Sequence, residues 1–189
     1  VYGLLGTTRF DEISGALAGA GDLSPGVLVG LVMIIAGLGF KIAAVPFHMW
    51  APDAYEGAPI PVTAYLAVGS KAAVFALVLR LFTEALMPAV TDWQLIIIIM
   101  AALTMVVGNL GALVQHNLKR LLAYSSIGHV GYLLVGVAAL ASVESDGKVS
   151  VELTAMATNG IILHIVAYAV ANMAAFLSVS AIYNVTGSD

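Results

Sequence analysis

Charged residues and cysteine are what this sequence lacks. Only 10% of its 189 residues are charged, and none is cysteine. Soluble domains carry about 25% charged residues, so this chain has too few charges to cover a water-exposed surface of its size. The absence of cysteine excludes iron–sulfur clusters and zinc sites that need cysteine ligands from this sequence. The net charge is −4 and no basic run is present, which argues against a nucleic-acid partner.

Apolar residues dominate instead. They make up 61% of the chain and gather in stretches long enough to cross a bilayer, which takes about 20 residues. The predicted spans are residues 26–47, 60–83, 95–114, 121–141 and 157–183. Because a membrane helix satisfies its own backbone hydrogen bonds, the sequence predicts an all-α, polytopic transmembrane helix bundle. We expect residues 1–189 to form one such domain and to be a piece of a longer chain, since the sequence does not begin with methionine.

Lys119 and Arg120 predict the orientation of the bundle. Cytoplasmic loops of membrane proteins are enriched in lysine and arginine, so we expect the loop before the fourth span to be cytoplasmic. Alternation of the spans then places the loop of residues 48–59 on the same side. Its carboxylates, Asp53 and Glu56, could attract protons to an entrance or could be ordinary solvated loop charges.

Lys71 lies near the centre of the second span. About eleven residues separate it from either end, which is about 16 Å at 1.5 Å per residue. A lysine at that depth cannot easily reach water, and inserting it costs roughly 2.5–3.5 kcal/mol. It could be a structural residue paired with a carboxylate elsewhere in the bundle. Ionisable residues inside membranes are by default candidates for ion or proton movement, so we predict that Lys71 carries protons.

Lys41 lies near the end of the first span, five residues before Pro46. Proline has no N–H, so the carbonyl of Ile42 loses its helical partner, and Gly37 and Gly39 weaken the preceding turn. We therefore expect the helix to break beside Lys41. A broken membrane helix that carries an ionisable residue is typical of transport sites. The alternative is a simple proline kink, with the lysine reaching the cytoplasmic interface.

The two lysines, Lys41 and Lys71, would also influence each other if they were close. Burial in a low dielectric and repulsion by a like charge both favour the neutral form of a lysine. A modest change nearby could then switch the protonation of one of them, which is what a proton carrier needs. We therefore predict that they act as a pair.

Histidines extend the polar set inside the predicted membrane. Ser125, His129 and Tyr132 share one helical face of the fourth span, and His164 and Tyr168 are spaced i,i+4 in the fifth. Imidazole and hydroxyl groups can relay protons through intervening water, so both histidines are candidate relay residues. The alternative is that these groups only form hydrogen bonds between helices.

Two long segments resemble a known family. FKIAAVPFHMWAPDAYEGAPIPVTAYLAVGSKAAVFALVLRLF, beginning at Phe40, resembles the core of subunit N of the proton-pumping NADH:quinone oxidoreductase, respiratory complex I. NLKRLLAYSSIGHVGYLLVG, beginning at Asn117, supports the resemblance, as does YAVANMAAF more weakly. The resemblance implies an antiporter-like subunit with two inverted repeats, each containing a broken helix. It places Lys41 on the lysine of the first broken helix and Lys71 on the lysine of the next helix.

The resemblance implies a proton-translocating subunit of this translocase, embedded in the bilayer of the cell inner (plasma) membrane beside other membrane-arm subunits. Electron transfer from NADH to quinone would occur in those other subunits. No catalytic residue, metal or bound cofactor is therefore expected in this chain, which also has no G-x-G-x-x-G fingerprint for NAD. Lys71 would be the central carrier, Lys41 the carrier at the helix break and His129 a link toward the exit. His164 differs from the tyrosine-like residue common in subunit N and resembles a histidine of the larger sister subunits.

Two alternative functions stay open at this point. A subunit of a multisubunit cation/proton antiporter would share the broken helix. Those proteins usually carry a histidine soon after a P-V-[ST]-A segment, whereas PVTAYLAVGSK contains none and offers Lys71, which favours subunit N. The other alternative is a passive structural membrane-arm subunit, whose lysines only hold the bundle together.

Overall fold

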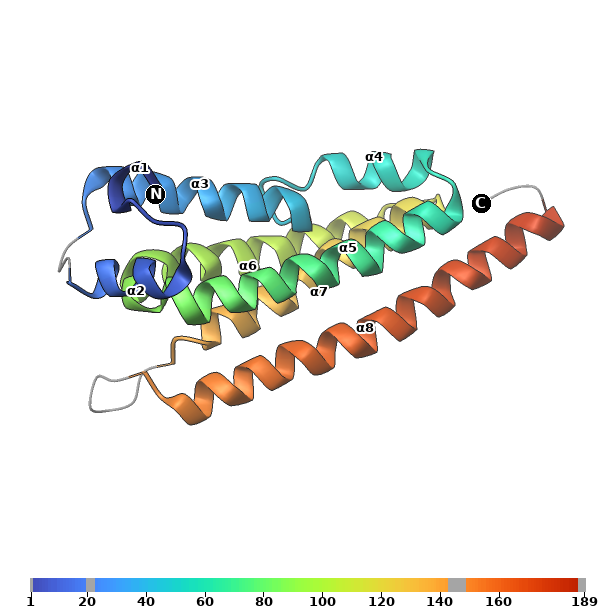
Figure 1. Cartoon of the computed structure of the whole chain (residues 1–189). Coiled ribbons are helices and arrows are strands. Elements are labelled where there is room, and N and C mark those ends of the chain that lie inside the picture. Colours follow the sequence, from blue (N-terminus) through green and yellow to red (C-terminus); the bar gives the residue numbers. More distant parts are fainter. Residues whose placement is uncertain (1, 20–22, 143–148, 187–189) are drawn as a thin grey trace.

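A computed structural model describes residues 2–19, 23–142 and 149–186 as a bundle of long helices (Figure 1). Five helical segments of the described chain are long and apolar enough to cross a membrane. They are α3 (Pro25–Ile42), α5 (Ile60–Arg80) with its π-helical extension η1 (Leu81–Ala85), α6 (Val90–Leu113) preceded by the 3₁₀ turn η2 (Met87–Ala89), α7 (Leu118–Ala139) and α8 (Val151–Thr186). The predicted all-α transmembrane bundle is confirmed.

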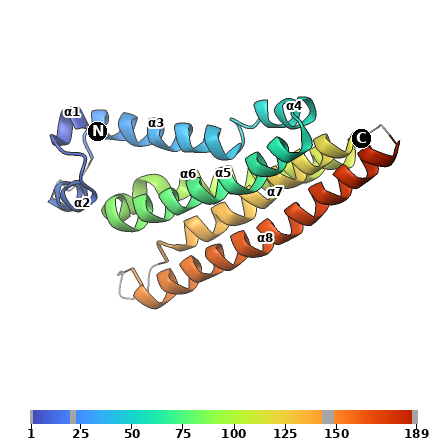
Figure 2. The same cartoon turned by 45° about the vertical axis from the view of Figure 1, so that its right-hand side comes forward.

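The long helices form a layered arrangement. In both views α5, α6 and α7 lie in the middle, α3 runs along one side and α8 along the opposite side (Figures 1 and 2). The short helices α1 (Tyr2–Leu5) and α2 (Phe10–Gly19) lie at one end of the bundle, and α2 packs against η1 and η2. At the other end α4 (Trp50–Gly57) continues the line of α3 and packs against α7.

Helices α6 and α7 form the closest pair in the bundle. A Cβ atom on Gly108 of α6 would lie 2.5 Å from the backbone nitrogen of Gly128, and one on Gly131 of α7 would lie 2.8 Å from that of Met105. Only a hydrogen fits at such contacts, so the glycines let the two backbones touch. The α6–α7 pair therefore forms a closely packed unit against which α3, α4 and α8 pack.

The helix break lies between α3 and α4. The first span was expected to continue to residue 47, but α3 ends at Ile42, and Ala43 adopts a left-handed conformation with φ 59° and ψ 43°. The N–H of Val45 donates a hydrogen bond of 3.0 Å to Oγ1 of Thr104, whose hydroxyl donates in turn to the carbonyl of Met100 at 2.5 Å. Helix α6 therefore supplies the partner that the unwound backbone lacks.

Helix α8 also departs from its expected bounds, because it begins at Val151 instead of residue 157. Ser150 precedes it, and the Ser150 hydroxyl accepts a hydrogen bond from the N–H of Leu153 at 3.4 Å. Serine at this position caps the first turn of a helix. The sequence contains this cap, but hydropathy alone does not detect it.

Candidate functional site

Lys71 is the centre of the buried polar site. It lies on α5 with only 4% of its surface exposed. Its Nζ donates hydrogen bonds to the backbone oxygen of Ser126, at 3.2 Å, and to the Ser126 hydroxyl. Within the described part of the chain, no carboxylate pairs with this ammonium. The amine is therefore held by neutral groups of α7, and not by the acidic partner that a structural ion pair would need.

Tyr168 brings α8 to the same point. Its hydroxyl oxygen lies 3.0 Å from the hydroxyl of Ser126 and 3.1 Å from the carbonyl oxygen of Ala67, one helical turn before Lys71. A tyrosine hydroxyl has one hydrogen, so it can donate to only one of these acceptors at a time. Three helices thus meet at a single serine, and the hydrogen-bond arrangement there can change without any movement of the backbone.

A small cavity opens beside Lys71. Its polar lining comes from the side chains of Lys71, Ser126, His129 and Tyr168, and its walls are apolar residues of α5, α7 and α8. The cavity measures about 10 Å³, close to the smallest volume that holds one water molecule. A water molecule there would have polar partners on several sides. Lys71 and His129 therefore face one shared space at the lower size limit for a single water molecule.

His129 and His164 form the next link. Nδ1 of His129 on α7 lies 3.2 Å from Nε2 of His164 on α8, so one ring donates to the other according to their tautomers. Both rings are half-buried. The ring centroid of Tyr132 lies 5.7 Å from that of His129 and 6.2 Å from that of His164. Three of the four ionisable residues predicted for proton movement thus form a continuous series from Lys71 to the face of α8.

Lys41 lies apart from this series. It is exposed in the last turn of α3, and α3 and α8 lie on opposite sides of the bundle (Figure 2). Across the described residues, no hydrogen bond or ion pair engages its ammonium. The structure places Pro46 in the unwound stretch between α3 and α4, and this stretch begins two residues after Lys41. The pairing of Lys41 with Lys71 and a carrier role for Lys41 both stay predictions.

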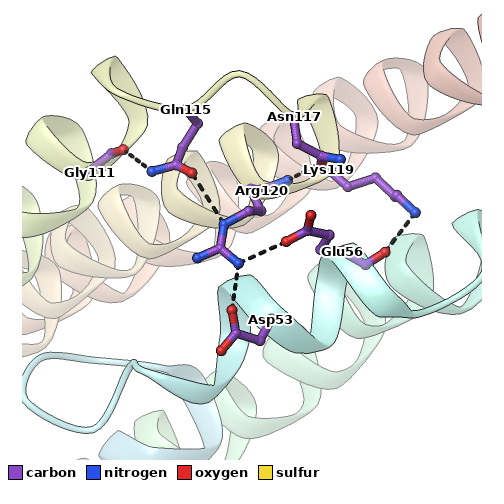
Figure 3. A network of polar contacts seen from close by, with 7 residues as sticks. All are labelled: Asp53, Glu56, Gly111, Gln115, Asn117, Lys119 and Arg120. Atoms are coloured by element: carbon purple, nitrogen blue, oxygen red, sulfur yellow. Dashed lines mark hydrogen bonds and ion pairs between the residues drawn. The ribbon is translucent and has the colours of Figure 1, made fainter. Parts of the chain in front are cut away.

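A second polar cluster ties α4 to the start of α7 (Figure 3). The guanidinium of Arg120 donates to Asp53 at 2.5 Å, to Glu56 at 2.8 Å and to the side chain of Gln115 at 3.2 Å. Nζ of Lys119 donates to the backbone oxygen of Glu56 at 2.7 Å. The two acidic residues are thus paired and are not simply solvated loop charges. The stretch of residues 48–59, expected to be a loop, mostly forms α4, and these contacts place it at the same end of the bundle as the basic pair, as the orientation argument requires.

Two residues of the site were missed by the sequence analysis. The predicted face of the fourth span contained Ser125, but the serine that contacts Lys71 is Ser126. Helix α4 also supplies Tyr55, whose side chain is only 1% exposed. The i,i+3 spacing of Ser126 and His129 was a usable signal. No comparable pattern marks Tyr55, because the residue follows the break in a stretch that hydropathy assigns to a loop.

Comparison with known proteins agrees with this architecture. All of residues 1–189 match the family described as NADH:quinone oxidoreductase/Mrp antiporter, transmembrane. The NADH-quinone oxidoreductase subunit N of Desulforamulus reducens is 46% identical over 189 residues, which cover 100% of this chain and 37% of that protein. Subunit N of Rhodospirillum rubrum is 55% identical over 139 residues, which cover 74% and 28%. The chain thus spans a little over a third of the first relative's length.

Two solved structures extend the comparison. A chain of respiratory complex I from Thermus thermophilus, solved with bound aureothin, matches 90% of this chain and 34% of its own length with 36% identity and a TM-score of 0.57. A chain of the membrane-bound sulfane sulfur reductase, an archaeal respiratory membrane complex, matches 99% and 36% with 30% identity and a TM-score of 0.75. Sequence and fold give the same assignment, and the chain belongs to the NADH:quinone oxidoreductase/Mrp antiporter transmembrane family.

Proposed function

We propose that this chain is part of a proton-translocating membrane subunit of an NADH:quinone oxidoreductase. The names of the subunit N relatives support this assignment. NAD and quinone would be bound by other subunits, where the electron transfer takes place. This subunit would lie in the cell inner membrane among the other membrane-arm subunits and would use the energy released by electron transfer to move protons.

The observation that carries the proposal is the environment of Lys71. A buried ammonium without a carboxylate partner among the described residues is costly to keep charged, so a small change in its surroundings can alter its protonation. Its contacts with Ser126 leave one side of the amine facing the cavity that it shares with His129. A structural lysine would gain more from a paired carboxylate than from this arrangement.

The geometry supports a definite order of proton transfer. Lys71 would release a proton to a water molecule in the cavity, and neutral His129 would accept it from that water. Nδ1 of His129 lies 3.2 Å from Nε2 of His164. The second transfer would therefore move one proton directly from the ring of His129 to the ring of His164. His164 is half-buried on α8 and would pass the proton out of this segment. Uptake of the next proton would return Lys71 to its charged form.

Replacing Lys71 by methionine tests the proposal. Methionine keeps the length and apolar stem of the side chain but cannot carry a proton. In the full-length subunit within the complex, Lys71→Met is expected to reduce proton pumping to the background level while the complex still assembles. Ala73→Met, at an exposed position of the same helix, controls for the added methionine and should pump normally.

The same experiment separates the alternatives. Loss of assembly in Lys71→Met would indicate a structural lysine and a passive membrane-arm subunit, and normal pumping would refute the carrier role. The family description also covers antiporters. If the intact protein exchanged sodium ions for protons in vesicles without an electron donor, the antiporter assignment would replace the one proposed.

A further inference from the structure

The hydroxyl group of Tyr55 is buried and has no hydrogen-bond partner among the described residues. Native proteins rarely leave a buried polar group unpaired, so such a group needs an explanation. Its side chain is only 1% exposed, and it belongs to a core cluster that includes Ala67 of α5 and Ala123 and Ile127 of α7. These residues flank the Lys71 site, because Ser126 directly precedes Ile127 and Ala67 accepts from Tyr168.

The Tyr55 hydroxyl lies next to the hydroxyl of Ser126. Burial raises the pKa of Tyr55, which lies outside the five candidate spans, to about 12, and the neighbouring Ser126 hydroxyl opposes part of this rise. The two groups are close, but their contact does not have the geometry of a hydrogen bond. Tyr55 is therefore a protonated phenol, with an unused hydrogen, beside the serine that holds Lys71.

The hydrogen bonds around Ser126 must differ between the two forms of Lys71. A charged lysine has three hydrogens to donate and no lone pair, and it donates to both oxygens of Ser126. A neutral lysine has a lone pair, and the Ser126 hydroxyl is the donor already in contact with it. When that hydroxyl turns toward the amine, its oxygen no longer accepts from Lys71, and it can accept a second hydrogen bond beside the one from Tyr168. Tyr55 carries a free donor at this place.

The ion pairs of Arg120 join α4, which carries Tyr55, to α7. Asp53 and Glu56 stand on either side of Tyr55 in α4, and both accept hydrogen bonds from Arg120 on α7. Arg120 lies on the same helix as Ser126. These ion pairs, together with the packing of α4 on α7, hold α4 near the end of the bundle where α7 begins (Figure 3). A shift of α4 would move the Tyr55 hydroxyl toward the Ser126 hydroxyl or away from it.

We propose that Tyr55 is a positioning residue that donates to Ser126 when Lys71 is neutral, so that α4, the second half of the broken helix, sets the protonation of Lys71. This inference rests on the proposed carrier role of Lys71. The titratable side chains that face Lys71 are His129 from α7 and Tyr168 from α8, with Tyr55 from α4 behind Ser126. Helix α3 supplies none to this cavity, and no acidic side chain of the described residues lines it.

The test is Tyr55→Phe in the full-length subunit of the assembled complex. Phenylalanine keeps the ring and its packing but removes the donor, which makes the neutral form of Lys71 less stable. Loss of one hydrogen bond is expected to move the pH profile of proton pumping to higher pH by about half to one unit. Tyr65→Phe is the matched control, because Tyr65 is exposed on α5, and its profile should be unchanged.

A double variant tests the role of the ion pairs. Arg120→Gln releases α4 from its acidic contacts and should change the pH profile in the presence of Tyr55. In the Tyr55→Phe background the same substitution should have no further effect, since α4 then has no donor to position. Effects that simply add would overturn the connection between α4 and Lys71.

The outcomes distinguish this inference from the proposed function. If Lys71→Met abolishes pumping and Tyr55→Phe leaves the pH profile unchanged, the role of Tyr55 is refuted and the carrier role survives. If Lys71→Met pumps normally, the proposed function fails. Should Tyr55→Phe not assemble, infrared spectra of ring-labelled tyrosine give a second test. Because Tyr168 also faces Lys71, the spectra are compared in a Tyr168→Phe background. A tyrosine band that changes with pH there and stays constant once Lys71→Met is added supports the inference, and a band unaffected by Lys71→Met overturns it.

Discussion

The α5–α7–α8 region and the α3–α4 region each bury a polar group within the helix bundle, but the two groups are stabilised differently. Around Lys71 a side-chain amine is buried and is satisfied by neutral oxygen atoms of Ser126. Around Lys41 the amine is exposed, and the buried polar group is the unwound backbone, whose Val45 N–H is bound by Thr104. The first arrangement can change with protonation, whereas in the second a hydrogen bond from the backbone to α6 supports the helix break.

The largest expected difference between the two regions concerns Lys41→Met. Because the Lys41 side chain is exposed and its ammonium forms no hydrogen bond or ion pair with other described residues, its removal should change the stability of the subunit by less than about 0.5 kcal/mol. If Lys41 is the second carrier, as predicted, proton pumping should nevertheless fall to the level of Lys71→Met. Pumping measured in vesicles together with thermal unfolding of the complex separates these effects. Normal pumping would restrict the carrier role to Lys71.

A smaller effect is expected from Thr104→Val. Valine keeps the shape of threonine but leaves the buried N–H of Val45 unpaired, which costs about 1–3 kcal/mol. The free energy of unfolding of the purified subunit measures this cost. Thr158→Val is the control, since the Thr158 hydroxyl donates to the carbonyl of Thr154 in its own helix. Equal losses in the two variants would show that α6 does not support the break.

The smallest effect is expected from Arg80→Gln. Arg80 pairs with Glu84 at 3.0 Å, one helical turn away, with 69% and 46% of the two side chains exposed. Exposed ion pairs contribute little and are screened by salt. The thermal midpoint should hardly change, whereas Arg120→Gln, which separates α4 from α7, should lower it clearly. A larger loss for Arg80→Gln would contradict the view that ion pairs matter here only where they join different helices.

Much of the fold could be predicted because lipid imposes simple rules on a sequence. Apolar runs of sufficient length identified the spans, and the intramembrane position of Lys71 identified the centre of the site. The bounds of α3 and α8 were less accurate, since Ala43 and Ser150 end or begin helices through local geometry that hydropathy does not measure. Hydropathy also gave no reason to place Tyr55 in a buried helix.

The contacts between distant segments could not be predicted. Which of two adjacent serines faces Lys71 depends on the rotation of α7, and a 100° step per residue separates the two faces. The pairing of Arg120 with Asp53 joins residues 67 positions apart, and it follows from the packing of α4 on α7. A single sequence contains the partners but not their distance, so the site emerged fully only from the three-dimensional arrangement.

The glycine contacts between α6 and α7 have a consequence for biogenesis. The two helices are antiparallel neighbours joined by only a few residues, and their backbones touch at Gly108 and Gly128. Helical hairpins of this kind can form as soon as both segments have entered the bilayer. The α3–α4 segment and the later α8 would then pack against this preformed hairpin during synthesis.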